Sequence, residues 1–364
     1  MRLRFLLVPM TFAGLSLTGC KTPAAPAPIA PPVKGALVSP WDTRTVPPTH
    51  AAYDCGQPFQ LAPNIAIVDK NYTPGDKQRA DSPAVYAQSS DAVADLAARI
   101  ASAADTYQQT GNLSAATCAA NLLAAAATDH AMAGWMFSRD ARHEQTKGLR
   151  SLAIGYLKIR NSGVILPSTN DYIIAWMEDI AHSLRDHYDA QGCRRNYCLT
   201  YDHNVASTAF ALASVAIAAN DHGMFSWSVR KYRQIVSEID DTGMLPPDIA
   251  GRTSLKFHLE STAALVQVAE YGELNNDPLY AYDNGAIHSL IHTTTGAIID
   301  PTPFVLRSHA RQSISHGLEG WEIGWATIYV RRFPDPLISK LLGESNDAGL
   351  YAWGGAPFGT EPDN

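Results

Sequence analysis

The most informative stretch of this sequence for its fold is residues 205–219, VASTAFALASVAIAA. It consists of alanine, valine and other small or apolar residues, and it contains no charged side chain. A helix that is apolar on nearly every side lies in the core of a protein. We therefore expect residues 205–219 to form a buried helix that other helices surround.

Apolar residues recur with helical spacing on both sides of this stretch, as Val93, Leu96 and Ile100 do on one face. Gly, Pro and Asn punctuate the loops, and strand-like alternation is scarce. We therefore expect an all-α domain of about nine helices, layered as hairpins in an α/α toroid or a solenoid, which periodicity alone does not separate. The expected helices begin near residues 90, 118, 149, 173, 205, 225, 255, 284 and 318.

The composition excludes several classes of protein. Of 364 residues, 46% are hydrophobic and 17% are charged, and the formal net charge is −7. This is too apolar for a wholly disordered chain, and the repeats of collagen and coiled coils are absent from the sequence. The acidic balance argues against a nucleic-acid partner, whose binding proteins are usually basic. It does not argue against a local basic pocket for an acidic ligand.

Residues 1–19 have the layout of a secretory signal peptide. Two arginines precede an apolar run over residues 5–17, which is too short to span a membrane comfortably. The following LTGC sequence resembles the bacterial lipoprotein signal, in which Cys20 is acylated; an ordinary signal peptide is the alternative. Lys21 after the cysteine is typical of outer-membrane retention. We therefore expect a periplasmic protein that a lipid anchors to the outer membrane.

The sequence after the signal divides into a tether and one domain. Residues 20–48 are rich in Ala and Pro and lack periodicity, which predicts an extended tether. Residues 49–364 are the expected folded domain, and we expect it to be a monomer.

Four cysteines follow Cys20, and an even number in an oxidising compartment indicates disulfides. Four cysteines allow three pairings. The short loop between Cys193 and Cys198 favours that pair, which leaves Cys55 with Cys118. Their spacing is not C-x2-C, so we expect no metal site here.

Motifs for nucleotide binding, zinc proteolysis and serine hydrolysis do not occur in the sequence. Three polar clusters interrupt apolar helices or lie at their ends. Simpler explanations for them are a helix cap, a surface ion pair and a solvated loop. The first cluster, LTYDHN at 199–204, is denser than a cap requires. The candidate residues in the three clusters are Tyr201, His203, Asn204, Arg252, His258, Glu260, Arg307 and Trp321.

Several blocks of the chain, in order, resemble the alginate lyase family of periplasmic mannuronate lyases. The resemblance runs from about Cys55 to Gly355 and implies an incomplete α/α toroid with a groove, and the activity of a polysaccharide lyase. The first block contains Lys70 and Tyr72, which the resemblance places in the substrate groove. The blocks are DKNYTPGD at 69–76, CAANL at 118–122, TKGLRSLAIGYL at 146–157, MFSWSV at 224–229 and IDDTGMLPPD at 239–248.

The resemblance implies β-elimination on a uronic-acid polymer. In this reaction a neutralised carboxylate makes the C5 proton removable, a base takes it and an acid protonates the departing O4. Two motifs depart from the family pattern at these groups. The Asn-Asn-His-x-Tyr-Trp motif is replaced by DHNVAS at 202–207, and the usual catalytic tyrosine position holds Glu260.

The leading interpretation is a lyase that acts on an anionic polysaccharide and needs no metal or organic cofactor. Asn204, His203 or Arg252 would neutralise the substrate carboxylate. The base would be His203, His258 or Glu260, and the acid Tyr201 or Tyr72. The substrate-binding candidates are Lys70, Tyr72, Arg252, Arg307 and Trp321.

Two other functions remain open at this point. One is an inactive polysaccharide-binding accessory of exopolysaccharide secretion. The other is a glycoside hydrolase that pairs the carboxylate of Glu260 with that of Asp202 or Glu322.

Overall fold

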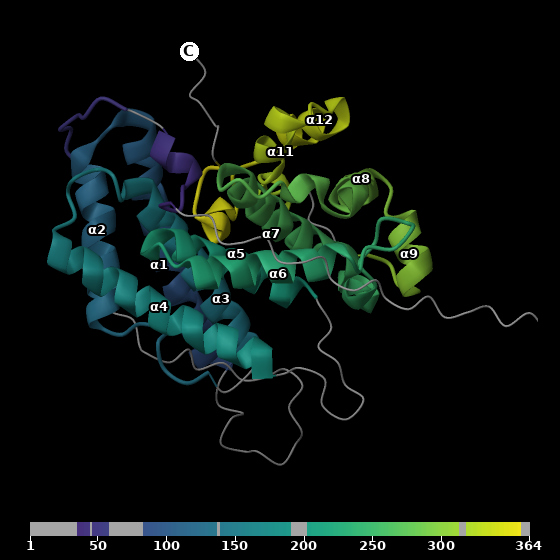
Figure 1. The fold of residues 1–364 in the computed structure, drawn as a ribbon, viewed down its shortest axis with the longest axis horizontal. Helices are drawn as coiled ribbons and strands as arrows, with labels where there is room; N and C mark the ends of the chain where they lie inside the picture. Colours follow the sequence, from purple (N-terminus) through teal and green to yellow (C-terminus); the bar gives the residue numbers. More distant parts are fainter. Residues whose placement is uncertain are drawn as a thin grey trace, which may run out of the picture. The chain divides into compact units, whose positions relative to one another are not determined.

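The structure is a computed structural model that describes residues 35–43, 46–57, 83–136, 139–190, 202–312 and 318–357. These residues belong to one compact unit, Val33–Asn364. Throughout the described ranges the regular structure is helical and no β-strand occurs, which confirms the all-α prediction (Figure 1). No helix within these ranges has the length and apolarity to cross a bilayer.

Eight long helices carry most of the fold, and four short ones follow them (Figure 1). The long helices are α1 (Pro83–Thr110), α2 (Leu113–Thr128), α3 (Arg139–Ile159), α4 (Pro167–Ala190), α5 (His203–Ala219), α6 (His222–Val236), α7 (Ser254–Leu274) and α8 (Ala286–Ile299). The short helices are α9 (Thr302–Ser308), α10 (Gly320–Ile323), α11 (Ala326–Arg332) and α12 (Pro336–Glu344).

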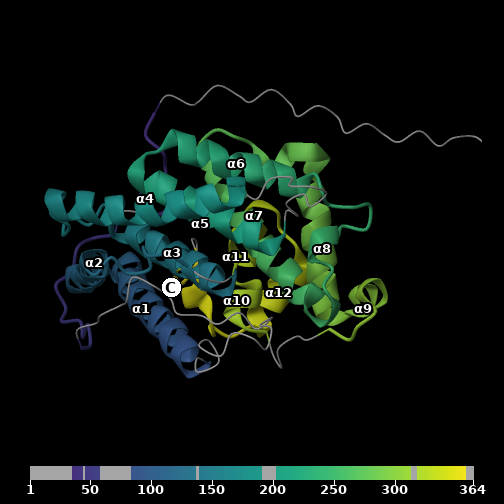
Figure 2. The same cartoon turned by 90° about the horizontal axis from the view of Figure 1, so that it is seen from below.

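Helix α5 is the central element that the sequence predicts. It packs against α3, α4, α6 and α7, and Figures 1 and 2 show it between these helices. Every residue from His203 to Ile217 is buried. Its many alanines let the neighbouring helices approach closely, so the polar residues of its first turn are drawn into the interior as well. The buried position of His203 and Asn204 therefore follows from the apolar sequence behind them.

The last predicted helix differs from the expectation. The residues from 318 to 331 form two short helices, α10 and α11, because the chain turns at Gly324 and Trp325 between them. Helices α9 and α12 were not expected, because each is shorter than ten residues and has a proline in its first turn. Such short helices give little periodicity to recognise.

Packed structure begins before the predicted domain boundary at residue 49. Leu37 and Trp41 are buried in the main hydrophobic core. The backbone N–H of Leu37 donates to Oδ1 of Asn220 at the C-terminal end of α5 (2.8 Å). The described residues 35–43 therefore pack on the helical body and are not part of a free tether. The reason is that the large apolar side chains of Leu37 and Trp41 are buried in the core.

A disulfide joins Cys55 to Cys118, with 5.5 Å between the Cα atoms. This is the pairing that the sequence analysis favoured for these two cysteines, and it fixes the segment before α1 to α2. Cys193, Cys198 and the proposed lipidation site Cys20 lie outside the described residues.

Candidate active site

Polar side chains from three helices meet at the N-terminal end of α5. His203 and Asn204 are the first residues of α5, and Glu260 lies in the second turn of α7. Helix α3 contributes His143, which neighbours all three: its ring contacts that of His203, its Nδ1 bonds Asn204 and its Nε2 faces Glu260. The structure thus brings together three of the residues selected from the sequence and adds a fourth. We call these four residues the site cluster.

A buried carboxylate holds the imidazole of His203. Nδ1 of His203 donates to Oδ1 of Asp248 at 2.9 Å, and the backbone N–H of His203 donates to the same oxygen at 2.9 Å. The other oxygen, Oδ2, accepts from the hydroxyl of Ser261 at 2.6 Å. Because a carboxylate can only accept, Nδ1 carries the proton and the lone pair of the neutral ring is on Nε2.

The ring of His203 is fixed in plane as well as in tautomer. It stacks on Phe257 with 3.8 Å between ring centroids and 8° between ring planes. Within the described part of the chain, Nε2 has no hydrogen-bond partner. Burial lowers the pKa of His203, but the hydrogen bond to Asp248 and the charges of Asp248, Glu260 and Asp202 outweigh burial and raise it above 6.5. An oriented imidazole with a free Nε2 and a raised pKa can act as a general base.

The second histidine, His143, connects Asn204 to Glu260. Asn204 donates from Nδ2 to Oδ2 of Asp202 (3.2 Å), so its Oδ1 accepts from Nδ1 of His143 (3.1 Å). Nε2 of His143 lies 3.7 Å from Oε1 of Glu260. Burial is the main reason that the pKa of His143 is lowered, although Glu260 acts in the opposite direction. Asn204, His143 and Glu260 therefore form one polar chain inside the helical body, and His203 joins it through the contact of its ring with that of His143.

Glu260 is a buried carboxylate surrounded by cationic and imidazole groups. Burial alone raises its pKa, but His143, His203, Arg150 and Lys147 together lower the pKa below its usual value. Burial lowers the pKa of Arg150 to about 10. Arg150 is held by Ser207 (2.7 Å) and by the ring of Trp353, whose centroid is 3.6 Å from the guanidinium carbon. Glu260 is thus an anion at neutral pH.

The carboxylates proposed as partners of Glu260 in a hydrolase have structural roles. Asp202 caps α5 by accepting from the backbone N–H groups of Asn204 and Val205, and it pairs with Arg139 at 2.8 Å. Glu322 is buried, and its side chain accepts from the backbone N–H of Glu319 in a capping box at the start of α10. The geometry therefore gives the glycoside hydrolase interpretation no support.

His258 does not belong to the site cluster, which corrects its selection as a catalytic residue. Its side chain is fully buried, and Nδ1 donates to the carbonyl of Ser254 at 2.7 Å. Nε2 accepts from the backbone N–H of Leu245 at 2.9 Å. Burial lowers its pKa, so the ring is neutral and both nitrogens are used. His258 joins the start of α7 to the preceding loop and has no atom left for catalysis.

The cationic and aromatic binding candidates lie outside this network. Arg252 is exposed on the turn before α7. Arg307 pairs with Asp240 at 2.8 Å and lines an open pocket between α8 and α9 to which none of the site cluster contributes. Trp321 is half-buried, and Lys256 of α7 lies over its ring at 5.5 Å. The remaining candidates, Lys70, Tyr72 and Tyr201, lie outside the described residues.

Four residues of the site were not selected from the sequence: His143, Lys147, Arg150 and Asp248. Lys147 and Arg150 lie in the block at 146–157, and Asp248 ends the block at 239–248, so the resemblance contained a signal for these three. His143 has no such signal in the sequence.

Comparisons with known proteins agree with this architecture. The sequence model of a family described as Alginate lyase matches residues 43–304. An alginate lyase of Pseudomonas syringae pv. syringae is 23% identical over 243 residues, which are 64% of this chain and 63% of the relative. An alginate lyase of Cobetia marina is 22% identical over 57% of this chain and 56% of the relative. The chain thus spans less than two thirds of the length of these curated relatives.

Solved structures share the fold at low sequence identity. A variant of alginate lyase A1-III complexed with tetrasaccharide has a TM-score of 0.67 and 17% identity, covering 84% of this chain and 85% of that one. Alginate lyase A1-III from Sphingomonas species A1 has a TM-score of 0.65 and 16% identity, covering 88% and 86%. The fold is therefore the α/α toroid, and the alternative of a solenoid is excluded.

Proposed function

This chain belongs to the alginate lyase family, and from that membership we propose that it is a polysaccharide lyase that cleaves a uronic-acid-containing polymer by β-elimination. The observation that carries the proposal is the buried pair of His203 and Asp248, which leaves Nε2 of His203 free. The ring of His143 contacts that of His203 and links it to Asn204 and Glu260. The names of the relatives and the tetrasaccharide bound to alginate lyase A1-III support an acidic polysaccharide as the substrate.

The first step of the proposed reaction uses His203 and Asn204. One amide hydrogen of Asn204 is bonded to Asp202, and the second is available to the uronate carboxylate. This contact makes the C5 proton more acidic. Nε2 of His203 then takes that proton, and the electron pair of the C5–H bond is delocalised into the neutralised carboxylate. Asp248 stabilises the imidazolium that results, because its negatively charged carboxylate accepts a hydrogen bond from Nδ1.

In the second step that electron pair forms the C4=C5 double bond as the C4–O4 bond breaks, and O4 takes a proton from an acid. Tyr201 or Tyr72 remains our proposal for that acid. Glu260 acts through its negative charge, which faces His143 and raises the pKa of His203. With its own pKa below the usual value, Glu260 is a poor base, and the proton of C5 therefore goes to His203 rather than to Glu260.

The function is tested by incubating the purified protein with a panel of polyuronates that includes the exopolysaccharide of the source bacterium. A lyase releases unsaturated uronates that absorb in the near ultraviolet, whereas a hydrolase releases reducing ends without that absorbance. Binding without either product across the whole panel would contradict the lyase proposal and support a binding accessory instead.

Asp248→Asn is expected to shift the pH profile of the reaction. The base must be unprotonated, so kcat/KM of the wild type should rise as the pH passes through the pKa of His203. That pKa is raised above 6.5. Without the carboxylate, that pKa falls and the rise moves to lower pH. We expect the plateau of kcat/KM to fall by roughly 10- to 100-fold, because the ring loses its orienting partner. An unchanged pH of half-maximal rate would exclude Asp248 as the partner of the base.

The same pair makes folding stability depend on pH. Because the folded-state pKa of His203 is raised, the stabilisation by Asp248 is fully present below about 6.5 and is lost as pH rises through the folded-state pKa. The unfolding free energy of the wild type should therefore fall over this range by more than that of Asp248→Asn, as measured by urea denaturation.

We also propose that the protein is anchored by lipid at Cys20 and faces the periplasm. The support is the signal layout of residues 1–20 and an even number of cysteines beyond it. Growth with a labelled fatty acid tests the proposal: the wild type should carry the label and Cys20→Ser should not. Equal labelling of both proteins would rule out Cys20 as the acylated residue.

A further inference from the structure

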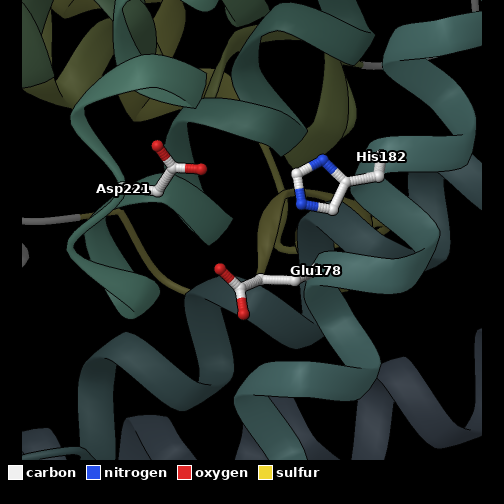
Figure 3. Close-up of side chains that lie close together, drawn as sticks. All are labelled: Glu178, His182 and Asp221. Atoms are coloured by element: carbon white, nitrogen blue, oxygen red, sulfur yellow. The ribbon is translucent and has the colours of Figure 1, made fainter.

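A second group of side chains with ligand chemistry lies at the surface where α4 meets the start of α6. Glu178 and His182 are one turn apart on α4, and Asp221 is the N-cap residue of α6. One ligand atom from each lies within 4.8 Å of the others. Figure 3 shows the three side chains facing a common space. We propose that Glu178, His182 and Asp221 bind a divalent transition-metal ion, for which Zn²⁺ is the natural probe.

The backbone fixes the position of all three side chains. Residues four apart on a helix project from the same face, so α4 presents Glu178 and His182 together. Oδ1 of Asp221 accepts from the backbone N–H groups of Gly223 (2.8 Å) and Met224 (3.0 Å). These two hydrogen bonds hold the carboxylate in place and leave its second oxygen for a ligand. A bound ion would therefore need little reorganisation of the three ligands.

Two polar groups of the cluster lack a partner in the part of the chain that the structure describes. Nδ1 of His182 is buried and makes no hydrogen bond. Figure 3 shows that the other ring nitrogen, Nε2, lies on the side that faces the two carboxylates, so Nε2 is the imidazole atom that would bind an ion. The carboxylate of Glu178 also makes no hydrogen bond to any described residue. These observations are independent of the spacing that defines the cluster.

The charges of the cluster favour a cation. Burial raises the pKa of Glu178, His182 lowers it, and the nearby carboxylates of Asp221 and Asp179 raise it further. The two carboxylates, when ionised, carry a charge of about −2, which a divalent ion balances. A metal ion would thus remove the repulsion between Glu178 and Asp221 and give the carboxylate of Glu178 a partner at the same time.

The donor set indicates which ions fit. Imidazole nitrogen is a ligand for zinc and its transition-metal neighbours, whereas Ca²⁺ and Mg²⁺ favour oxygen ligands throughout. Structural zinc sites usually have four protein ligands, so a site with three would be completed by water. The ion would link α4 to the N-terminal end of α6 and stabilise the folded state by mass action.

The test is calorimetric titration of the purified, chelator-treated protein with Zn²⁺. We expect one site of micromolar or tighter affinity, and a melting temperature that rises with Zn²⁺. His182→Ala and Glu178→Gln should each weaken binding by about tenfold or more and remove the rise in melting temperature. Ca²⁺ should bind at least tenfold more weakly than Zn²⁺.

Asp179→Asn is the matched control, because it removes one charge from the exposed neighbour of Glu178 on the same helix. It should weaken Zn²⁺ binding far less than Glu178→Gln does. The proposal is overturned if the wild type does not bind Zn²⁺, or if His182→Ala binds as tightly as the wild type. An equal loss in Asp179→Asn and Glu178→Gln would also overturn it, since general electrostatic attraction would then explain the binding.

Discussion

His203→Asn should lower kcat/KM on the polyuronate substrate by about 10³-fold, within the range that general acid–base catalysis supplies. The asparagine amide can still donate to Asp248, so the buried carboxylate keeps a hydrogen bond. It has no basic nitrogen, and the C5 proton then has no acceptor in the position of Nε2. The measurement is the initial rate at which near-ultraviolet absorbance increases as the unsaturated product forms.

His309→Asn is the matched control for this substitution. His309 is exposed and has a φ of 54°, a conformation that asparagine adopts readily. It lies outside the site cluster, so its rate should equal that of the wild type. Wild-type kcat/KM in His203→Asn, with the control also unchanged, would remove His203 from the mechanism.

Glu260→Gln should lower kcat by about 10²-fold while leaving KM within a few-fold of the wild type. The substitution keeps the size of the side chain but removes the charge that stabilises positive charge on His203. Because that charge also raises the pKa of His203, the rise of the rate with pH should move to lower pH. The measurement is the pH profile of kcat for both proteins.

Glu260→Asp separates the effect of charge from that of shape. It retains a carboxylate, so its pH profile should stay closer to that of the wild type than the profile of Glu260→Gln. If both variants lose rate equally and both keep the wild-type pH profile, Glu260 has a packing role only. A rate equal to the wild type in Glu260→Gln would exclude Glu260 from the reaction.

Most of the fold can be predicted from the sequence, because its signals are long and regular. Residues 205–219 are apolar on nearly every side, which predicts a helix surrounded by others, as α5 is. The short helices α9 and α12 could not be predicted, since fewer than three turns leave almost no periodicity. The packing of Leu37 and Trp41 was missed for a related reason: two apolar residues in an Ala- and Pro-rich segment make no pattern.

The site is less predictable, because its contacts join residues far apart in the chain. His203 and Asn204 stand out as a polar pair before an apolar helix, and Glu260 stands at the position of a catalytic tyrosine in the family resemblance. His143 is brought to them by the packing of α3 on α5, which no local pattern encodes. His258 matched the resemblance and yet is a buried structural residue, because sequence does not show that both its nitrogens are bonded.

The central claim is that cleavage proceeds by elimination and not by hydrolysis, and the origin of the oxygen in the products tests it most directly. In water enriched in a heavy oxygen isotope, a hydrolase places the isotope in the new reducing end, whereas a lyase adds no water at the cleaved bond. Reducing ends also exchange their oxygen with water, and this background is subtracted. The mass spectrum of the wild-type products should then show an unsaturated end and no heavy oxygen introduced by cleavage. Saturated products that carry one heavy oxygen for each bond cleaved would contradict the account.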